Sequence, residues 1–542
     1  MTLAQFTLGA LPLGPLLAAA ISVLLAPRAR RVLGLMTAAG VLVLAGYLTV
    51  IVAGGEAVAL PLGGFLPPLG IVIRADGLSV LFLCLAALVG AAVTVYAAAL
   101  PQTTGERLRT PAASSGEAPA PRWQPGHPAF WPLWLGCWAG LNGVFVAGDL
   151  FNTYVALELV GLCAVALVAL GGSRAWAPAL RYLFVAVLGS LLFLIAVGLL
   201  VSVTGSLDFA QVAERLAQSP ETHPVALTAL ALATLGLAVK FALVPLHQWL
   251  VPAHAGAASA ISPLLSALVI KAALFVLLRC WLWVVGPGVT DSVPDGATSA
   301  SLDALGLMAW IPALMGAAAV VLGSVMALRQ DRLKPLVAYS TVAQAGYWTL
   351  LFPVVLGPGA DLGDDGWAAG QLADQDVFAA ALGGTVALAI GHGLAKGAMF
   401  LVAGTFKELY GTDEISRLRS VAREHPLLVM TAGLAAVGLA GLPISLGFTG
   451  KWELATAAVA AGHHWILAVL VIGTLLSAAY LLRMIAPLLV ESVDEERIEP
   501  PARRLPSLPL AARVAPFTLG ALTVATGFLG VWMARLLEVG AP

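Results

Sequence analysis

Two lysines and two histidines lie within residues 236–271, GLAVKFALVPLHQWLVPAHAGAASAISPLLSALVIK, among apolar residues of the kind that cross membranes. A charged side chain at the centre of a bilayer costs about 2.5 to 3.5 kcal/mol on insertion scales. Lys240 and Lys271 therefore need an ion pair, bound water or a functional role that offsets this cost. Amines and imidazoles bridged by water pass protons, so proton transfer is the chemistry that these residue types indicate.

A carboxylate in a second apolar stretch, GDLFNTYVALELVGLC, is a candidate partner for one of these lysines. Glu158 lies about two helical turns inside that stretch, too deep for a carboxylate that simply faces the membrane surface. It could form a structural ion pair with a lysine, or it could change the lysine's proton affinity as the two groups approach and separate. Both interpretations pair Glu158 with a buried amine.

Further candidates follow in the second half of the chain. His392 and Lys396, in ALAIGHGLAKGAMF, are spaced i and i+4 and share one helix face. Because histidine has an unperturbed pKa of about 6.5, this pair could exchange protons at neutral pH. Lys451 follows the sequence GLPISLGFTG, and it is expected to be the counterpart of Lys240. Glu453 is two residues further along and is expected to face elsewhere.

Proline positions predict two interrupted helices. Pro245 with Pro252 breaks the first apolar run, and Pro443 breaks the second. An interrupted helix inside a membrane exposes carbonyl groups that can organise water around an ammonium group. His247 and His254 flank the first break, and either a structural or a proton-carrying role remains open for them.

Composition places the chain among membrane proteins. Of its 542 residues, 60% are hydrophobic and 11% are charged, whereas soluble domains carry about 25% charged residues. The net charge of −1 argues against a nucleic acid or an anionic lipid surface as a partner, since both bind basic patches. Four cysteines lie in or beside apolar runs without a CxxC motif or a cysteine–histidine cluster, so neither a metal nor another cofactor is expected: Cys84, Cys137, Cys163 and Cys280.

Apolar runs of about 20 residues, the length that crosses a bilayer, predict an all-α polytopic membrane protein with about fourteen spans. We expect helices near 5–26, 31–53, 77–100, 129–147, 150–171, 178–204, 223–250, 259–285, 304–328, 335–357, 376–404, 425–458, 463–487 and 513–537. The first run lacks the basic region and cleavage site of a signal peptide, so we expect it to remain as a helix.

The distribution of basic residues supports this count, because cytoplasmic loops are enriched in Lys and Arg. With both termini outside, 20 of the 28 basic residues fall on or near cytoplasmic connections, including Lys334. The outer side keeps Arg74, Arg215, Arg279 and Arg535. The remaining four lie at membrane depth: Lys240, Lys271, Lys396 and Lys451.

These spans divide the chain into five parts. We expect an N-terminal three-helix segment at 1–100, a cytoplasmic loop at 101–128, a first repeat at 129–285, a second repeat at 304–487, and a linker with a C-terminal helix at 488–542. Each repeat contains one broken helix. Paired broken helices in corresponding positions are typical of internally repeated transporters. Asp149, before the fifth span, is expected at a helix N-terminus.

Five motifs in chain order resemble the antiporter-like subunits shared by Mrp-type cation/proton antiporters, respiratory complex I and membrane-bound hydrogenases. They are GDLFNTYVALELVG, GLAVKFALVPLHQWLVPAH, LKPLVAYSTVAQAGY, GHGLAKGAMFLVAG and GLPISLGFTGKW. The resemblance implies two inverted five-helix repeats around the two broken helices. It also implies that Glu158 and Lys240 form a charged pair and that Lys271, His392 and Lys451 continue a hydrophilic axis.

Within that family, the chain resembles most closely the D-type component of Mrp antiporters, since Lys451 stands where a central complex I subunit usually has glutamate. The expected function is therefore proton translocation in a multisubunit Na⁺/proton antiporter of the cell membrane, with other membrane subunits as partners. Two alternatives stay open: the same module attached to a quinone reductase or hydrogenase, or to an inorganic-carbon uptake complex. In each case the chain itself is a transporter subunit that carries no redox cofactor.

Overall fold

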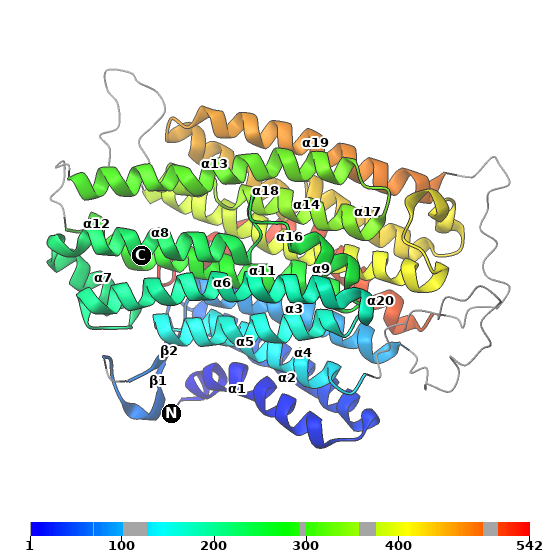
Figure 1. The fold of residues 1–542 in the computed structure, drawn as a ribbon, viewed down its shortest axis with the longest axis horizontal. Helices are drawn as coiled ribbons and strands as arrows, with labels where there is room; N and C mark the ends of the chain where they lie inside the picture. The colour runs from blue at the N-terminus through cyan, green and yellow to red at the C-terminus, as the bar shows by residue number, and fades with distance from the viewer. Residues whose placement is uncertain are drawn as a thin grey trace.

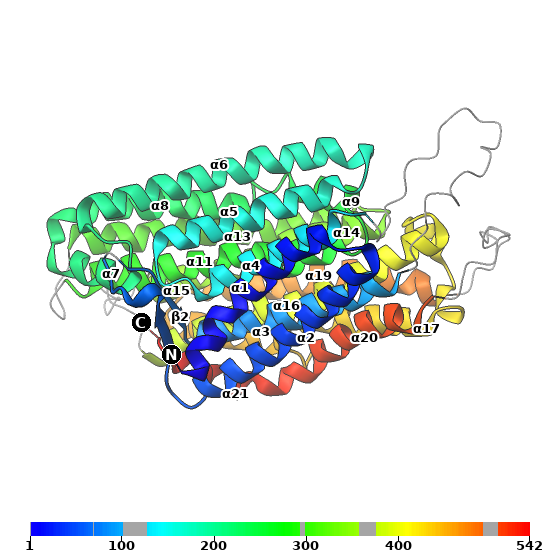
Figure 2. The same ribbon diagram turned by 90° about the horizontal axis from the view of Figure 1, so that it is seen from below.

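The computed structural model describes residues 2–68, 70–100, 127–292, 299–356, 375–490 and 508–541. Most of the expected loop at 101–128 and of the expected linker after residue 487 lies outside these ranges. The helices run side by side along the long axis of the molecule, and both chain termini lie at the same end of this bundle (Figures 1 and 2). An even number of crossings brings both termini to one side of a membrane, as the fourteen expected spans require.

The N-terminal segment is a layer of three helices with a β-hairpin between the second and the third. Helices α1 (Leu3–Leu24) and α2 (Pro27–Val52) lie along one edge of the bundle (Figure 1), and α3 (Gly77–Ala99) packs further inside. Strands β1 (Val58–Pro61) and β2 (Val72–Ala75) are antiparallel, with Val58 opposite Ala75, and a short 3₁₀ turn, Leu62–Gly64, lies between them.

Residues 129–285, expected to be a first repeat, begin with three helices. They are α4 (Phe130–Val146), α5 (Leu150–Ala169) and α6 (Ser173–Thr204). Asp149 caps α5, because its side chain accepts a hydrogen bond from the backbone N–H of Asn152 at 2.8 Å, as expected. A short helix, α7 (Phe209–Gln218), and a 3₁₀ turn, Pro220–Thr222, then lead into α8 (His223–Lys240).

The remainder of the first repeat alternates α-helical and π-helical segments. After α8 come α9 (Leu250–Gly256), α10 (Ile261–Leu264), a π-helical segment η3 (Leu265–Val269), α11 (Ile270–Arg279), a second π-helical segment η4 (Cys280–Val285) and α12 (Gly286–Thr290). A π-helical turn inserts an extra residue and redirects the side chains and carbonyls around it, and such turns are frequent at functional sites.

The second half of the chain, expected to be a second repeat, is also helical. Its helices are α13 (Ala300–Leu328), α14 (Leu333–Tyr347), α15 (Leu351–Leu356), α16 (Gln375–Tyr410), α17 (Pro426–Ala440), α18 (Leu446–Ala460) and α19 (His464–Leu489). Two 3₁₀ turns, Ile415–Leu418 and Val421–Arg423, precede α17. The C-terminal span consists of α20 (Leu510–Ala525), a 3₁₀ turn at Thr526–Leu529, and α21 (Gly530–Glu538).

Both expected helix breaks are present. The first separates α8 from α9, contains Pro245, and places Ala242 at a φ of 58°; the second separates α17 from α18, contains Pro443, and begins at Gly441 with a φ of 74°. Glycine favours this left-handed conformation because it lacks a Cβ atom. Pro252 lies inside the first turn of α9, beyond the break, where a missing N–H removes no intrahelical hydrogen bond.

All fourteen expected spans coincide with helical segments. In the described part of the chain, eleven helices are long and apolar enough to cross a membrane, and two shorter apolar helices, α4 and α17, add to them. Leu333–Leu356 forms a helical pair, α14 and α15, where one span was expected. The prediction of an all-α polytopic membrane protein with one broken helix in each half is therefore confirmed.

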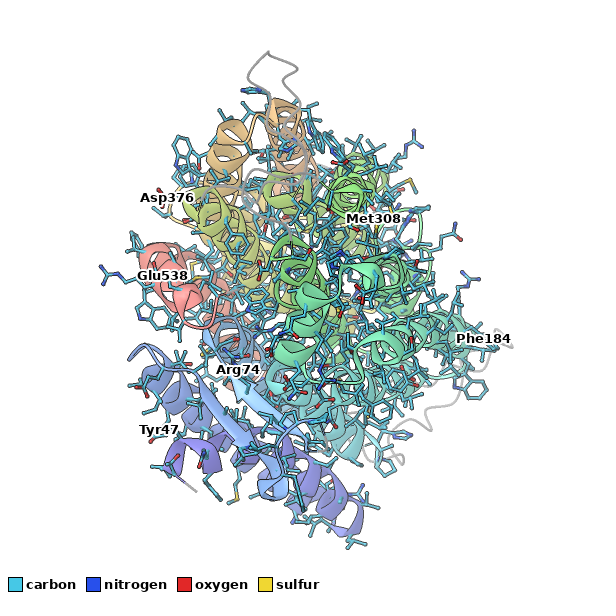
Figure 3. All side chains as sticks on the ribbon, turned by 90° about the vertical axis from the view of Figure 1, so that its left-hand side faces the viewer. Tyr47, Arg74, Phe184, Met308, Asp376 and Glu538 are labelled. Atoms are coloured by element: carbon cyan, nitrogen blue, oxygen red, sulfur yellow. The ribbon has the colours of Figure 1, made fainter. Side chains whose placement is uncertain are left out.

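Burial identifies the centre of the bundle. The apolar window of Ile261–Thr290 is entirely buried, and those of α3 and α16 are 83% buried, whereas that of Leu510–Glu538 is only 28% buried. The end-on view shows the side chains of the outer helices projecting outward, as Phe184 of α6 does (Figure 3). The three most buried segments form the core against which the two broken helices pack.

Candidate functional site

The first cluster of ionisable residues joins α5, α6 and α8. Lys240 Nζ lies 3.4 Å from Glu158 Oε1, and the two side chains are 8% and 24% exposed. The hydroxyl of Ser190, on α6, also donates a hydrogen bond to Glu158 Oε1. The structure thus brings together the carboxylate and the lysine that the sequence resemblance paired, and it adds a hydroxyl that shares the same carboxylate oxygen.

Two glycines allow the helices of this cluster to approach closely. A Cβ atom on Gly236 of α8 would lie 2.4 Å from the carbonyl oxygen of Gly189 on α6, and one on Gly189 would lie 2.6 Å from the carbonyl oxygen of Gly236. These contacts are shorter than any real Cβ tolerates, so both positions require glycine. Their contact places Lys240, one turn beyond Gly236, directly between α5 and α6.

Lys240 is the last residue of α8, so it stands at the edge of the first break. The carbonyl oxygen of Val239 accepts a hydrogen bond from Trp249 Nε1 at 2.9 Å, across the interrupted segment. The ring of Trp249 stacks on Tyr182 of α6 with 4.2 Å between centroids. The interruption is therefore held by specific contacts at the point where the charged pair lies.

The second cluster lies in the buried core. Lys271 Nζ and His392 Nδ1 are hydrogen-bonded, and Lys271 also donates to the carbonyl oxygen of Ser266 at 2.8 Å. Ser266 belongs to the π-helical segment η3, which directs its carbonyl group toward the amine. The indole ring of Trp348 covers the ammonium group, with 4.8 Å between Nζ and the ring centroid.

Contact between two basic groups has a direct consequence for their protonation. A hydrogen bond between Lys271 and His392 needs one donor and one acceptor, so at least one of the two groups is neutral when it forms. Two adjacent positive charges in a buried site would also repel each other strongly. While this hydrogen bond exists, the pair therefore carries at most one positive charge, which either residue can hold.

Lys396 lies one helical turn beyond His392 and points toward α14. Its ammonium group donates to the carbonyl oxygen of Val337 at 2.9 Å and to the hydroxyl of Ser340. Nearby, the hydroxyls of Ser266 and Thr341 are 2.8 Å apart, which links η3 to α14. Helix α14 therefore supplies neutral oxygen acceptors to this lysine rather than a carboxylate.

Lys451 lies at the second break, in the first turns of α18. Its ammonium group donates to the carbonyl oxygen of Ala440 at 3.0 Å and to the hydroxyl of Thr474, on α19, at 2.9 Å. Ala440 is the last residue of α17, and the break leaves its carbonyl without an intrahelical partner. Glu453 is directed elsewhere, as expected, since its Oε2 lies near Gly383 of α16.

The two histidines near the first break occupy different surroundings. His254 is completely buried in α9, and its ring stacks on Phe400 of α16 at 4.4 Å. Neither ring nitrogen of His254 has a hydrogen-bond partner among the described residues. His247 is half-buried within the interrupted segment, and its Nδ1 also lacks such a partner. A buried imidazole without a protein partner is a suitable position for bound water.

Lys334, expected at the cytoplasmic interface, is the second residue of α14. The side chain is buried, and its ammonium group donates to the carbonyl oxygen of Ala257 at 2.8 Å, just after α9. Position 334 does begin a helix, α14, but the segment that follows α9 covers it. Only the tertiary packing reveals this, because the local sequence DRLKP is polar.

Arg279, expected on the outer side of the membrane, is buried in an ion pair. Its Nη2 lies 2.5 Å from Asp76 Oδ1, with the side chains 7% and 1% exposed. Trp283 lies against the guanidinium group, and its Nε1 donates to the carbonyl oxygen of Gly540 at 2.7 Å, so the C-terminal end covers the pair. The apolar residues on both sides, LFVLLRCWLWVV, were a signal in the sequence that this arginine is buried.

Hydrogen bonds among the described residues do not join the clusters into one continuous chain. Within the described residues, hydrogen bonds connect Glu158 with Lys240 and Lys271 with His392, while Lys396 and Lys451 each bind other partners. The same residues include no group of three or more His, Cys, Asp or Glu side chains that could hold a metal ion. Bridging water would be needed to carry protons between clusters.

Comparison with known sequences gives a consistent set of matches. A family described as "NADH:quinone oxidoreductase/Mrp antiporter, TM" matches residues 147–294, 296–356 and 377–477, more than half of the chain. The N-type component of the NADH-quinone oxidoreductase of Desulforudis audaxviator is 34% identical over 502 residues, which cover 90% of this chain and 89% of that protein. The D-type component of the Na(+)/H(+) antiporter of Bacillus subtilis is 28% identical over 426 residues, covering 78% and 74% respectively.

Solved structures show the same fold. A chain of the Mrp complex from a Dietzia species matches with a TM-score of 0.79 and 23% identity, covering 99% of this chain and 97% of that one. A chain of respiratory complex I from Thermus thermophilus matches with a TM-score of 0.67 and 23% identity, covering 98% of both chains. These similarities concern the fold, and they extend over nearly the whole length of the chain.

Proposed function

The chain belongs to the NADH:quinone oxidoreductase/Mrp antiporter transmembrane family, and from this premise we propose that it is the proton-translocating subunit of a multisubunit monovalent cation (Na⁺)/proton antiporter. The observation that carries the proposal is the hydrogen bond between Lys271 and His392 in the most buried part of the bundle. Such a pair can carry one positive charge, and in the proposed mechanism a proton passes between its members. The proposed relay consists of Glu158, Lys240, Lys271, His392, Lys396 and Lys451.

The Glu158–Lys240 pair is the proposed control point of this relay. While the two groups are close, the carboxylate stabilises the protonated lysine. When they separate, the lysine loses that stabilisation in a poorly solvated site and releases its proton toward Lys271. The neighbouring helix break supports this role, because an interrupted helix permits small movements that a continuous hydrogen-bonded helix resists.

Neutral acceptors support the later steps. Lys396 and Lys451 bind carbonyl and hydroxyl oxygens, which hold an ammonium group without neutralising it by an opposite charge. A proton bound there is released at a lower cost than one held in an ion pair. His247 and His254 are secondary candidates, since water bound to their free ring nitrogens could extend the path.

We further propose that the chain works beside other membrane subunits in the plasma membrane, with both termini outside. The units 129–285 and 304–487 would act as two transport repeats. A redox-driven complex is the rival setting, and the 34% identity with a quinone oxidoreductase subunit favours it. The 28% identity with the D-type component of an Na(+)/H(+) antiporter favours the antiporter.

Purification of the tagged native complex in mild detergent separates these two settings. Mass spectrometry would identify the partner subunits, and iron, flavin and nickel would be assayed in the same sample. Small membrane subunits without redox cofactors, together with Na⁺-dependent proton flux in proteoliposomes, would support the antiporter. Iron–sulfur or flavin subunits would overturn that setting and leave the proton path in place.

The path itself is tested with Lys240→Ala in the reconstituted complex. We expect proton translocation to fall by at least about 100-fold, because Glu158 is left as an unpaired charge and the first proton carrier is lost. Lys407→Ala, near the end of α16, provides a control that removes a lysine outside the relay. Normal assembly with full activity in Lys240→Ala would exclude this lysine from the mechanism.

A further inference from the structure

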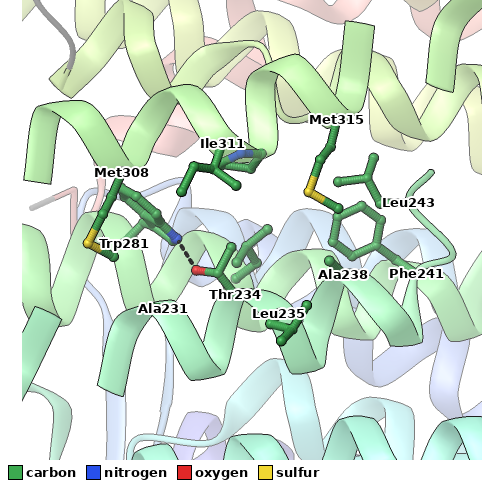
Figure 4. A pocket seen from close by; sticks show the side chains of 12 residues that line it. Ala231, Thr234, Leu235, Ala238, Phe241, Leu243, Trp281, Met308, Ile311 and Met315 are labelled. Atoms are coloured by element: carbon green, nitrogen blue, oxygen red, sulfur yellow. Dashed lines mark hydrogen bonds between the residues drawn. The ribbon is translucent and has the colours of Figure 1, made fainter. Parts of the chain in front are cut away.

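An apolar cavity lies between α8, the α11–η4 segment and α13, next to the first helix break. It has a volume of about 90 Å³ (Figure 4). Thr234 and Leu235 contribute from α8, Trp281 from η4, and Ile311 from α13. Its remaining walls include Phe241 and Leu243, which directly follow Lys240 in the chain. The cavity therefore borders the interrupted segment on the side away from Glu158.

Water is a poor occupant of this cavity. The polar side-chain atoms near the cavity are the hydroxyl of Thr234 and the indole nitrogen of Trp281. They satisfy each other, because Trp281 Nε1 donates a hydrogen bond to Thr234 Oγ1 at 2.8 Å (Figure 4). The Thr234 hydroxyl also donates to the carbonyl oxygen of Leu230 at 2.7 Å. A buried water needs two to four polar partners, and cavities with satisfied, apolar walls remain dry and accept apolar guests.

The entrance to the cavity faces the outer surface of the bundle. Leu235 and Ile311, at its edge, are 44% and 57% exposed, and Leu307 and Leu314 on the same side of α13 are also exposed. Thr234 lies eleven residues beyond His223, or about 17 Å along α8. At that depth the surrounding medium is the hydrocarbon core of the bilayer, which is about 30 Å thick.

We propose that this cavity binds the terminal part of a lipid acyl chain, and that the bound chain packs against Phe241 and Leu243 to support the break beside Lys240. The entrance, the apolar walls and the depth all match hydrocarbon. Filling an empty apolar cavity restores the dispersion contacts that its walls otherwise lack. The effect on transport rests on the proposed function, whereas the binding of the chain does not.

The binding is tested on the intact complex in nanodiscs of phosphatidylcholine with bromine near the ends of the acyl chains. Electron cryo-microscopy would compare these particles with particles in unbrominated lipid. We expect bromine density inside the cavity. Density from a protein segment of a neighbouring subunit at the same place, or a cavity without bromine, would overturn the proposal.

Two variants at exposed positions of α13 provide a matched pair. Ile311→Trp places a large ring over the entrance, whereas Leu314→Trp adds the same ring at a position that is equally exposed, at 56%, and does not line the cavity. We expect bromine density to disappear in Ile311→Trp and to persist in Leu314→Trp. Bromine density that is unchanged in both variants would contradict entry between Leu235 and Ile311.

The consequence for transport is measured with the same two variants. If the bound chain supports the break, proton flux through Ile311→Trp falls by about fivefold, which is the smallest effect typical of energetic coupling between two sites. Proton flux through Leu314→Trp is expected to stay unchanged. Loss of bromine without a change in flux would overturn the supporting role. The proposed function is tested separately, and full proton flux through Lys240→Ala would contradict it.

Discussion

The two broken helices hold their lysines in opposite ways. In the first repeat, Lys240 is the last residue before the break, and it pairs with a carboxylate that Ser190 also contacts. In the second repeat, Lys451 follows the break, and it binds the freed carbonyl oxygen of Ala440 and the hydroxyl of Thr474. An ion pair at membrane depth holds a charge strongly, whereas neutral acceptors hold it more weakly. Under the proposed function, the first break would control proton capture and the second would favour proton release.

A second ion pair extends this contrast. Asp76 and Arg279 are both buried, and Arg279 lies eight residues, about 12 Å, beyond Lys271 on the same helical segment. The pair links that segment to the start of α3, while the C-terminal end closes over it through Gly540. The lysines of the second repeat, Lys396 and Lys451, have no carboxylate within ion-pair distance among the described residues.

The largest expected effect is a loss of protein stability when the buried ion pair between Asp76 and Arg279 is broken. Asp76→Asn leaves the buried guanidinium of Arg279 without a counter-charge, and it should cost about 3 to 5 kcal/mol. Thermal unfolding of the purified complex measures the loss. Asp331→Asn is the matched control, since its pair with Arg483 is 2.7 Å long but exposed, and it should cost no more than about 1 kcal/mol. Equal shifts of the unfolding temperature in the two variants would contradict a larger stabilising effect of the buried pair.

Next in size is the charge at the first break. Glu158→Gln keeps the shape of the side chain but removes the charge that holds the proton on Lys240. Proton flux should fall about 30-fold, the equivalent of about 2 kcal/mol for a disrupted buried pair. Glu221→Gln, an exposed carboxylate before α8, should leave flux unchanged. If Glu158→Gln and Glu221→Gln both transport protons at the normal rate, the charge of Glu158 does not control proton transfer at the first break.

A smaller effect is expected from the helix contact that positions Lys240. Gly236→Ala drives a methyl group into the carbonyl oxygen of Gly189, so α8 must move away from α6 at a cost of about 1 to 3 kcal/mol. Gly198→Ala, on α6, meets no atom within 4 Å and is the control. Thermal stability and proton flux are measured together. If Gly236→Ala matches Gly198→Ala in both measurements, the close approach does not position the lysine.

The smallest effect is expected at the second break. Thr474→Val removes one acceptor from Lys451 and leaves the carbonyl oxygen of Ala440 in place, which corresponds to about 1 kcal/mol and a few-fold change in flux. Thr456→Val, an exposed position on α18, serves as its control. A loss as large as that of Glu158→Gln would show that the two breaks hold their lysines with similar strength.

Much of the architecture was predictable from the chain alone. The resemblance to antiporter-like subunits is confirmed by the family match and by the relatives of known sequence. Helix positions followed from the length of the apolar runs, and the two breaks followed from Pro245 and Pro443. The roles of the six relay residues stay predictions that the flux measurements above test.

What the sequence alone determined is where the apolar helices and their two breaks lie, because hydropathy and span length are properties of continuous stretches of chain. What only the tertiary structure decided is which residues meet. Ser190 contacts Glu158 across 32 residues, and Arg279 reaches Asp76 across 203 residues. Lys334 lies in the polar sequence DRLKP, and the segment after α9 buries it. Such contacts depend on how helices pack, and packing brings together residues whose separation in sequence carries no signal of their proximity.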